Sequence, residues 1–224
     1  MCRVLILSGM NNHDWQRTTP YIKEILETAD FKVDVTESVS ECLSDYDNIK
    51  DYDVIVSEYN GTPWSESAEA NFIKKISDGC GVVSLHAANN WAMNFTEYEK
   101  MLGYNWINDV SGHGHYHEFL VNFKEKSHPI LNGIEEFRIK DELYHKLSPK
   151  HDIPYTIIAE AYSAEDKLGS GNYEPMVITT EYGNGRCVHN MLGHVWNGGE
   201  MSSVENESYK KLLINCCLWA VNHI

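Results

Sequence analysis

The chain of 224 residues has a hydrophobic fraction of 42%, which is enough for one sizeable core, so we expect one domain over residues 1–224. Its formal net charge of −15 argues against nucleic acid or an anionic membrane as a partner, because both need a basic surface. No stretch approaches the roughly 20 apolar residues of a membrane-spanning helix, and the short apolar N-terminal run lacks a cleavage site for export. We therefore expect a cytoplasmic protein whose six cysteines, none spaced as C-x-x-C, are reduced thiols.

The first half of the chain alternates strands with amphipathic helices. Apolar runs predict strands, covered on both faces, at 3–8, 31–36, 53–58 and 81–86. Thr19-Pro20 predicts the start of the first helix, because Thr caps helices well and Pro is favoured at the first helical position. Ser65 and Gly79 predict the start and the end of a second helix. Such strand–helix–strand units imply right-handed crossovers and a parallel sheet.

The second half of the chain predicts an antiparallel extension of that sheet. Alternating or apolar runs predict strands at 113–123, 155–160, 175–181 and 186–191. Tyr182-Gly183-Asn184-Gly185 is a hairpin signal between the last two strands. A final helix is expected at 204–221, where apolar residues recur at helical spacing. The elements together predict an α/β, flavodoxin-like three-layer sandwich with a mostly parallel central sheet.

Polar and aromatic side chains follow four of the predicted strands. They include His13, Asn60, His86, Asn89, Asn90, Trp91, His194 and Trp196. In open parallel sheets ligands bind beyond the carboxyl ends of the strands, so these residues predict a shared site. Amides, histidines and aromatic rings suit a sugar-like ligand, whose ring faces stack and whose hydroxyls need donors and acceptors. The alternative is that many of them are ordinary turn and cap residues.

Two clusters in the middle of the chain could carry chemistry. In an extended strand His113, His115 and His117 would share one face and line the rim of a cavity, where two imidazoles could bind Zn²⁺ or another divalent ion. The competing interpretation is a glycine-flanked loop with one functional histidine. Residues 141–145, Asp-Glu-Leu-Tyr-His, could supply a metal ligand, a general base or both. Here the competing interpretation is the first turn of a helix, where acidic residues favour the helix dipole.

Several familiar chemistries are not supported by the sequence. Residues 84–89 after the fourth predicted strand contain no cysteine, and Cys80 precedes that strand, so a covalent acyl-enzyme mechanism is not expected. Ser84 lies inside the strand without a Gly-x-Ser-x-Gly turn to expose it. The first turn, residues 8–13, lacks both the dinucleotide fingerprint and the P-loop, so neither NAD nor ATP is expected as a cofactor.

A series of short motifs spans nearly the whole chain. These are Leu5-Ile6-Leu7-Ser8-Gly9, His13-Asp14-Trp15, Arg17-Thr18-Thr19-Pro20, Tyr52-Asp53-Val54, Tyr59-Asn60-Gly61, Leu85-His86-Ala87-Ala88-Asn89, Gly112-His113-Gly114, His128-Pro129-Ile130, Asp141-Glu142-Leu143-Tyr144-His145, Glu174-Pro175-Met176, Tyr182-Gly183-Asn184-Gly185-Arg186 and Leu192-Gly193-His194. In this order they resemble the ThuA-like family, named for a trehalose-utilisation protein. The resemblance implies a class I glutamine amidotransferase-like fold without amidotransferase chemistry, and a connection to disaccharide or 3-keto-sugar catabolism.

The leading hypothesis is a metal-assisted hydrolase, lyase or isomerase that acts on a small-molecule sugar. In this hypothesis Glu142 is the proton-transfer base and Asp141 orients it. The predicted metal or pocket residues are His86, His113 and His194, and His86 is also predicted to be catalytic. The residues predicted to position the substrate are His13, Asn60, Asn89 and Trp196. Two alternatives stay open: a non-catalytic sugar-binding or regulatory module, and a scaffold with a degenerate site. The sequence is also compatible with a homo-oligomer.

Overall fold

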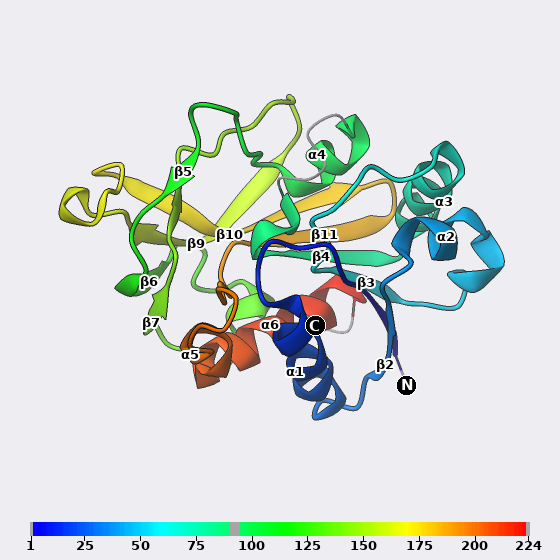
Figure 1. The fold of residues 1–224 in the computed structure, drawn as a ribbon, viewed down its shortest axis with the longest axis horizontal. Helices are drawn as coiled ribbons and strands as arrows, with labels where there is room; N and C mark the ends of the chain where they lie inside the picture. Colours follow the sequence, from blue (N-terminus) through cyan, green and yellow to red (C-terminus); the bar gives the residue numbers. More distant parts are fainter. Residues whose placement is uncertain (1, 90–94, 223–224) are drawn as a thin grey trace.

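The computed structural model describes residues 2–89 and 95–222, so the strand-end residues Asn90 and Trp91 lie outside the described part. A nine-stranded sheet forms the centre of this part (Figure 1). In chain order its strands are β1 (Arg3–Leu7), β2 (Lys32–Thr36), β3 (Val54–Ser57), β4 (Gly81–Leu85), β6 (His117–Phe123), β7 (Phe137–Asp141), β9 (Tyr155–Tyr162), β10 (Tyr173–Tyr182) and β11 (Gly185–Asn190). Two further strands, β5 (Gly112–His113) and β8 (Tyr144–His145), pair with each other in a separate small sheet.

The sheet is parallel on one side and antiparallel on the other. Its order is β2-β1-β3-β4-β11-β10-β9-β6-β7. The first five strands pair in parallel, and each later strand pairs antiparallel with its neighbour. The predicted α/β fold with a mostly parallel sheet and an antiparallel extension is confirmed. Because the four reversals from β11 to β7 cancel, β7 points in the same direction as β1, β4 and β11, and its carboxyl end lies at the same edge.

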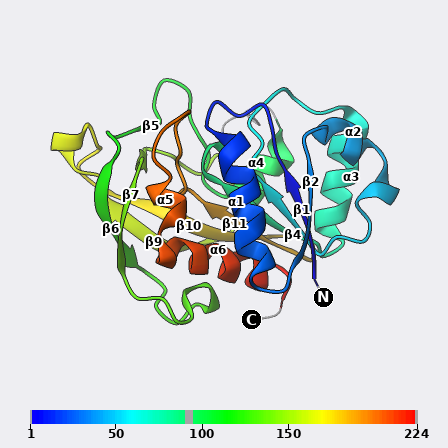
Figure 2. The ribbon, with the colours of Figure 1, turned by 60° about the horizontal axis from the view of Figure 1, so that its bottom comes forward.

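Helices cover both faces of the sheet (Figures 1 and 2). They are α1 (Trp15–Glu27), α2 (Val39–Ser44), α3 (Glu66–Ser77), α4 (Thr96–Leu102), α5 (Ser202–Glu205) and α6 (Glu207–Ala220), with short 3-10 turns η1 (Tyr46–Asn48), η2 (His86–Asn89), η3 (Pro129–Leu131) and η4 (Glu165–Lys167). On β1, Val4 and Ile6 face the core under α1 and α6, while Leu5 and Leu7 face the core under α2, α3 and α4. Alternate side chains of a strand point to opposite faces, which is why a continuous apolar run suits this position.

Local signals placed several element ends correctly. The Ser65 hydroxyl accepts the N–H of Ala68 at the start of α3, and Gly79 follows that helix with φ +115°. Tyr182 pairs with Gly185 across the predicted hairpin between β10 and β11. Among the described residues, no helix combines the length and the apolar character needed to cross a membrane.

The start of α1 differs from the sequence prediction. The helix begins at Trp15, so Pro20 lies inside it instead of at its first position. The Thr18 and Thr19 hydroxyls do not cap the helix but donate to the buried carboxylate of Glu58. Pro20 leaves the Gln16 carbonyl without its helical donor, and both residues are exposed, so water can satisfy that carbonyl. The hydrogen bonds to Glu58, which is distant in the chain, therefore take the threonine hydroxyls that the sequence suggested for capping the helix.

The predicted histidine stripe at 113–117 does not form. Strand β5 ends at His113 and β6 begins only at His117, while His115 is exposed and donates its N–H to the carbonyl oxygen of Lys167. A Cβ at Gly114 would lie 2.8 Å from that same oxygen, so the close approach requires glycine and takes the chain out of line with β6.

The segment that begins at Asp141 is also not a helical turn. Asp141 ends β7, and Tyr144 and His145 form β8, which pairs with Gly112 and His113. The alternative interpretation of residues 141–145 as the first turn of a helix is therefore wrong. This pairing brings His113 beside Glu142.

Candidate functional site

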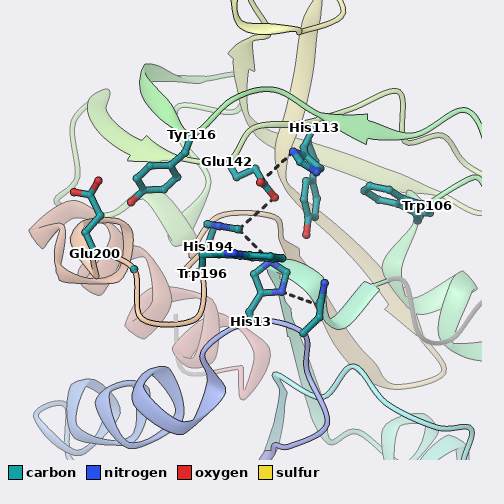
Figure 3. Close-up of a pocket in the computed structure, with 11 residues that line it drawn as sticks. His13, Trp106, His113, Tyr116, Glu142, His194, Trp196 and Glu200 are labelled. Atoms are coloured by element: carbon teal, nitrogen blue, oxygen red, sulfur yellow. Dashed lines mark hydrogen bonds and ion pairs between the residues drawn. The ribbon is translucent and has the colours of Figure 1, made fainter.

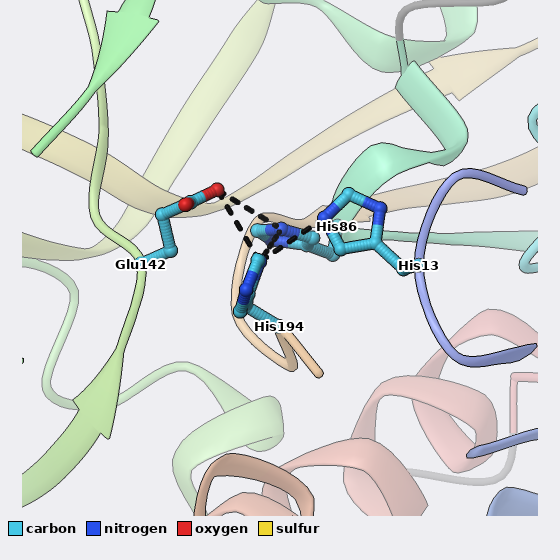
Figure 4. A group of neighbouring side chains, drawn as sticks. All are labelled: His13, His86, Glu142 and His194. Carbon is cyan, nitrogen blue, oxygen red and sulfur yellow. Dashed lines mark hydrogen bonds and ion pairs between the residues drawn. The ribbon is translucent and has the colours of Figure 1, made fainter. Parts of the chain in front are cut away.

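Four side chains from distant parts of the chain converge at one edge of the sheet (Figure 4). They are His13 after β1, His86 after β4, Glu142 after β7 and His194 after β11, and their ligand atoms all lie within 4.8 Å of one another. We call these four residues the His/Glu cluster. Their meeting follows from topology, because the four strands point the same way and end at the same edge.

The Nδ1 atom of His194 is at the centre of the cluster. It lies 3.0 Å from His13 Nε2, 3.2 Å from His86 Nε2 and 3.2 Å from a carboxylate oxygen of Glu142. The same Glu142 oxygen, Oε2, is 3.9 Å from His86 Nε2. In Figure 4 the carboxylate of Glu142 faces the imidazoles from the side opposite His13.

Carbonyl oxygens determine which nitrogen of His13 and of His86 carries the proton. His13 Nδ1 lies 3.0 Å from Asn11 Oδ1 and 2.9 Å from Asn12 Oδ1, and His86 Nδ1 lies 2.8 Å from the carbonyl oxygen of Met191. A carbonyl oxygen can only accept, so in both rings Nδ1 carries the hydrogen and Nε2 has a bare lone pair.

The cluster therefore contains more acceptors than donors. The two Nε2 lone pairs and the Glu142 carboxylate all face His194 Nδ1, which can carry at most one proton. One proton cannot serve three acceptors, whereas a cation among these atoms would satisfy all of them. Outer hydrogen bonds from the opposite ring nitrogen to a carbonyl are also the usual support of histidine ligands.

Burial keeps the histidines of the cluster in the form that binds metals. Burial, together with the neighbouring His194, lowers the pKa of His13 to about 4. Burial is also the main reason that the pKa of His86 lies well below its ordinary value of 6.5. Both imidazoles are therefore neutral at pH 7, and neutral imidazole is the ligand form.

His86 occupies the turn in which amidotransferase-like enzymes would carry a nucleophile. It directly follows β4 and has φ +41°, a left-handed conformation that is strained for a residue with a Cβ. Cys80 lies at the opposite end of the same strand, and burial raises the pKa of its thiol to about 12. The strained turn thus presents an imidazole to the His/Glu cluster.

Asp141 supports the cluster without reaching the cavity. Its fully buried carboxylate accepts the backbone N–H of Glu142 at 2.7 Å, of His194 at 3.0 Å and of Gly193 at 2.7 Å. Burial raises the pKa of Asp141 to about 7 although three N–H groups favour its charged form. Asp141 therefore ties Glu142 to the turn that carries His194.

A cavity of about 580 Å³ opens in front of the cluster (Figure 3). It is lined by Asn12, His13, Trp106, His113, Tyr116, Glu142, Tyr144, His194, Trp196, Gly199 and Glu200. Glu142 connects the cluster to the cavity mouth, because its Oε1 lies 3.0 Å from Nδ1 of the half-exposed His113. His113 is therefore next to the cluster but not one of its four members.

The residues predicted to position a substrate have different locations. Trp196 is 55% exposed and lines the cavity, with its ring parallel to that of His194 at 5.8 Å. Asn60 does not line it but donates to Asn12 Oδ1 at 3.1 Å. Asn89 is buried beside His189, 3.1 Å from its Nε2, and does not line the cavity.

Several cavity residues were given no individual role from the sequence. They are Asn12, Trp106, Tyr116, Tyr144 and Glu200. Tyr144 lies within residues 141–145, and Tyr116 lies between the candidate histidines His115 and His117, so sequence proximity to candidate site residues was a usable signal for both. Trp106 and Glu200 lie in segments without a regular pattern, and only the fold brings them to the cavity.

Comparisons with known proteins agree with this fold. A family model described as ThuA, trehalose utilisation, matches residues 3–220. The structure is similar to a ThuA-like protein from Parabacteroides merdae ATCC 43184, with 29% identity, a TM-score of 0.87, and coverage of 98% of this chain and 90% of that chain. A ThuA-like protein from Bacteroides uniformis ATCC 8492 is 20% identical with a TM-score of 0.73, over 98% of this chain and 91% of that one.

The expected amidotransferase-like fold is also confirmed. A glutamine amidotransferase from Thermotoga maritima matches with 14% identity and a TM-score of 0.56, covering 98% of both chains. None of the curated proteins compared with the chain matches it.

Proposed function

The chain belongs to the ThuA family, whose description, trehalose utilisation, indicates a carbohydrate-related role, and we propose that it is a metal-assisted enzyme acting on a disaccharide or 3-keto-sugar derivative. The observation that carries this proposal is the excess of acceptors in the His/Glu cluster, where two bare Nε2 atoms and a carboxylate face His194 Nδ1. The reaction is a hydrolysis, an elimination or an isomerisation, each of which needs a proton moved beside a polarised oxygen.

The donor set fits Zn²⁺ or a similar divalent ion held by His13, His86 and His194. Zn–N bonds of about 2.0–2.1 Å in a tetrahedral site put ligand atoms about 3.3–3.4 Å apart. The nitrogens of His13 and His86 lie 3.0 and 3.2 Å from His194 Nδ1, close to that spacing. When bound, such an ion polarises a carbonyl or hydroxyl oxygen of the sugar. In this proposal His13 takes the place that the sequence suggested for His113.

Glu142 is the proposed proton-transfer base. One of its oxygens faces the cluster, and the other lies 3.0 Å from His113 at the cavity mouth. A carboxylate in this position can take a proton from a sugar held over the cluster. His113 Nδ1 lies 3.0 Å from both the Gly114 carbonyl oxygen and Glu142 Oε1, so it carries a hydrogen and holds the carboxylate in place as a donor. Asp141 fixes the backbone of Glu142 relative to that of His194, because it accepts hydrogen bonds from the N–H groups of Glu142, Gly193 and His194. No step requires a cysteine.

The cavity lining suits a sugar. Trp106, Tyr116 and Trp196 offer aromatic rings, and Asn12 and Glu200 offer polar groups for hydroxyls. We place the protein in the cytoplasm, because Cys80, Cys187, Cys216 and Cys217 are buried thiols without a disulfide. The same lining would serve a sugar-binding module that does no chemistry, so the test must measure turnover as well as binding.

Two measurements on protein purified without a histidine tag test the proposal. The first is divalent metal content, where wild type and the exposed control His115→Ala should retain about one ion per chain and His194→Ala should lose it. The second is turnover of 3-keto-disaccharides, where Glu142→Gln should lower kcat by about a hundredfold or more. Glu118→Gln, at an exposed ion pair with Arg138, is the matched control. Metal-free wild type would refute the metal site, and binding without turnover would leave the sugar-binding module.

A further inference from the structure

The cavity extends to both sides of the His/Glu cluster. Figure 3 shows Trp106 and Tyr116 on opposite sides of Glu142, with Glu200 beyond Tyr116. All four residues line the same cavity of about 580 Å³. The cluster therefore lies in the middle of the cavity and not at one closed end.

The first side is apolar and rigid, and we call it the Trp106 wall (Trp106 and Tyr144). The Tyr144 ring stacks on that of His86, with centroids 4.3 Å apart and planes 25° apart. Trp106 packs edge-on against Tyr144 at 5.3 Å and against a small core that includes Tyr144 and Met191. Packing on several sides fixes this platform, and a fixed aromatic face loses little conformational entropy when a ring stacks on it.

The second side is polar, and we call it the Tyr116 wall (Tyr116 and Glu200). The Tyr116 ring lies 5.6 Å from that of His194, and its hydroxyl lies 2.8 Å from Ser202 Oγ. Glu200 is held by an ion pair with Lys140, and its other oxygen accepts a hydrogen bond from Ser202 Oγ at 3.1 Å. A carboxylate offers about four acceptor positions, so Glu200 can still accept hydrogen bonds from sugar hydroxyls.

The two walls touch different members of the cluster. The Trp106 wall stacks on His86, the Tyr116 wall packs on His194, and the facing nitrogens of these two histidines are only 3.2 Å apart. A ligand that fills both walls must therefore have its middle over His194 and Glu142.

We propose that the two walls are separate subsites for the two rings of a disaccharide-like ligand, and that the linkage between the rings lies over Glu142. One ring stacks on the Trp106 wall, and the other donates hydroxyls to Glu200 on the Tyr116 wall. This assignment rests on the proposed function and sharpens it, because a base that faces the linkage is suited to a two-ring substrate and not to a free monosaccharide.

Binding calorimetry with glucose, trehalose, maltose and cellobiose tests this assignment on the protein as purified. At least one disaccharide should bind about tenfold or more tightly than glucose. Trp106→Ala and Glu200→Gln should each weaken that disaccharide about two- to tenfold, and together by the product of the two effects, because the walls share no contact. Trp106→Phe should retain most of the affinity, since it keeps a ring face.

Matched controls separate a subsite from a general loss of structure. Tyr173→Ala removes an exposed aromatic ring that does not line the cavity, and Glu205→Gln removes a charge from the neighbouring helix. Both should bind like wild type. Equal binding of glucose and all three disaccharides, or unchanged disaccharide binding in both wall variants, would overturn the assignment. The metal content of the same proteins distinguishes this failure from failure of the proposed function. Neither wall variant alters a residue of the His/Glu cluster, so metal bound in wild type and in both variants would mean that only the subsite assignment has failed.

Discussion

The buried carboxylate of Glu58 gives a sharp prediction about stability and pH. Glu58 is 7% exposed, and its carboxylate accepts hydrogen bonds from the hydroxyls of Thr18 and Thr19. Burial raises its pKa from 4.5 to about 7, against the opposite effect of the two hydroxyls. The folded protein therefore holds this proton more tightly than the unfolded chain. The stability that the proton contributes is complete below about pH 4.5 and is lost as the pH rises through about 7.

The size of the effect follows from the shift. A pKa that rises from 4.5 to about 7 on folding corresponds to about 3 kcal/mol of unfolding free energy. Most of it should be lost between about pH 5 and pH 8. Glu58→Gln has nearly the same shape but no charge, and the threonine hydroxyls can rotate to accept from its amide. The variant should match wild type near pH 5 and exceed its stability by about 2–3 kcal/mol at pH 8.

Urea unfolding of wild type and Glu58→Gln at intervals from pH 5 to pH 8 measures this difference. At each pH the unfolding free energy of wild type is subtracted from that of Glu58→Gln. Groups that titrate in both proteins contribute equally and cancel, so the difference reports the contribution of Glu58. A difference that stays constant with pH, or that favours wild type more strongly at high pH, would contradict the argument. Metal content should be the same in both proteins, because Glu58 is not a member of the His/Glu cluster.

Three further substitutions test the support of the site. Asn11→Ala should weaken metal affinity about tenfold or more in a chelator competition, because it removes a carbonyl that holds the His13 tautomer. Asp141→Asn should lower the unfolding free energy by about 1–3 kcal/mol in urea, because an amide group would face a backbone N–H that now has an acceptor. Gly114→Ala should lower it by about 1–3 kcal/mol and so reduce Tm, since its Cβ would lie 2.8 Å from the Lys167 carbonyl oxygen. An unchanged result in any of these would remove that contact from the account of the site.

Signals that depend on neighbours in sequence were informative. The apolar run at the start of the chain predicted β1 because both of its faces are buried, with Val4 on one side and Leu5 on the other. Ser65 marked the start of α3, and the turn at residues 182–185 marked the hairpin. Each of these features is stabilised within a few residues of itself, so its cause is visible locally.

Signals that depended on distant partners were misleading. Thr19-Pro20 has the composition of a helix start, yet the threonine hydroxyls bond to Glu58 from the turn after β3. His113, His115 and His117 alternate like a strand, yet the contact between Gly114 and Lys167 separates them. In both cases a tertiary hydrogen bond or close approach outweighed the local preference.

The sequence by itself determined the alternation of strands and helices, and it located polar residues after the strands that end at one edge. It could indicate that His13, His86 and His194 belong near one another, because parallel strands present their carboxyl ends together. Only the tertiary structure decided that Glu142 joins them from the end of β7, a strand that was not predicted from the sequence, and that His113 lies beside the second oxygen of Glu142. The reason is that a site of a few ångströms depends on sheet order and on the β5–β8 pairing, and these contacts join residues far apart in the chain.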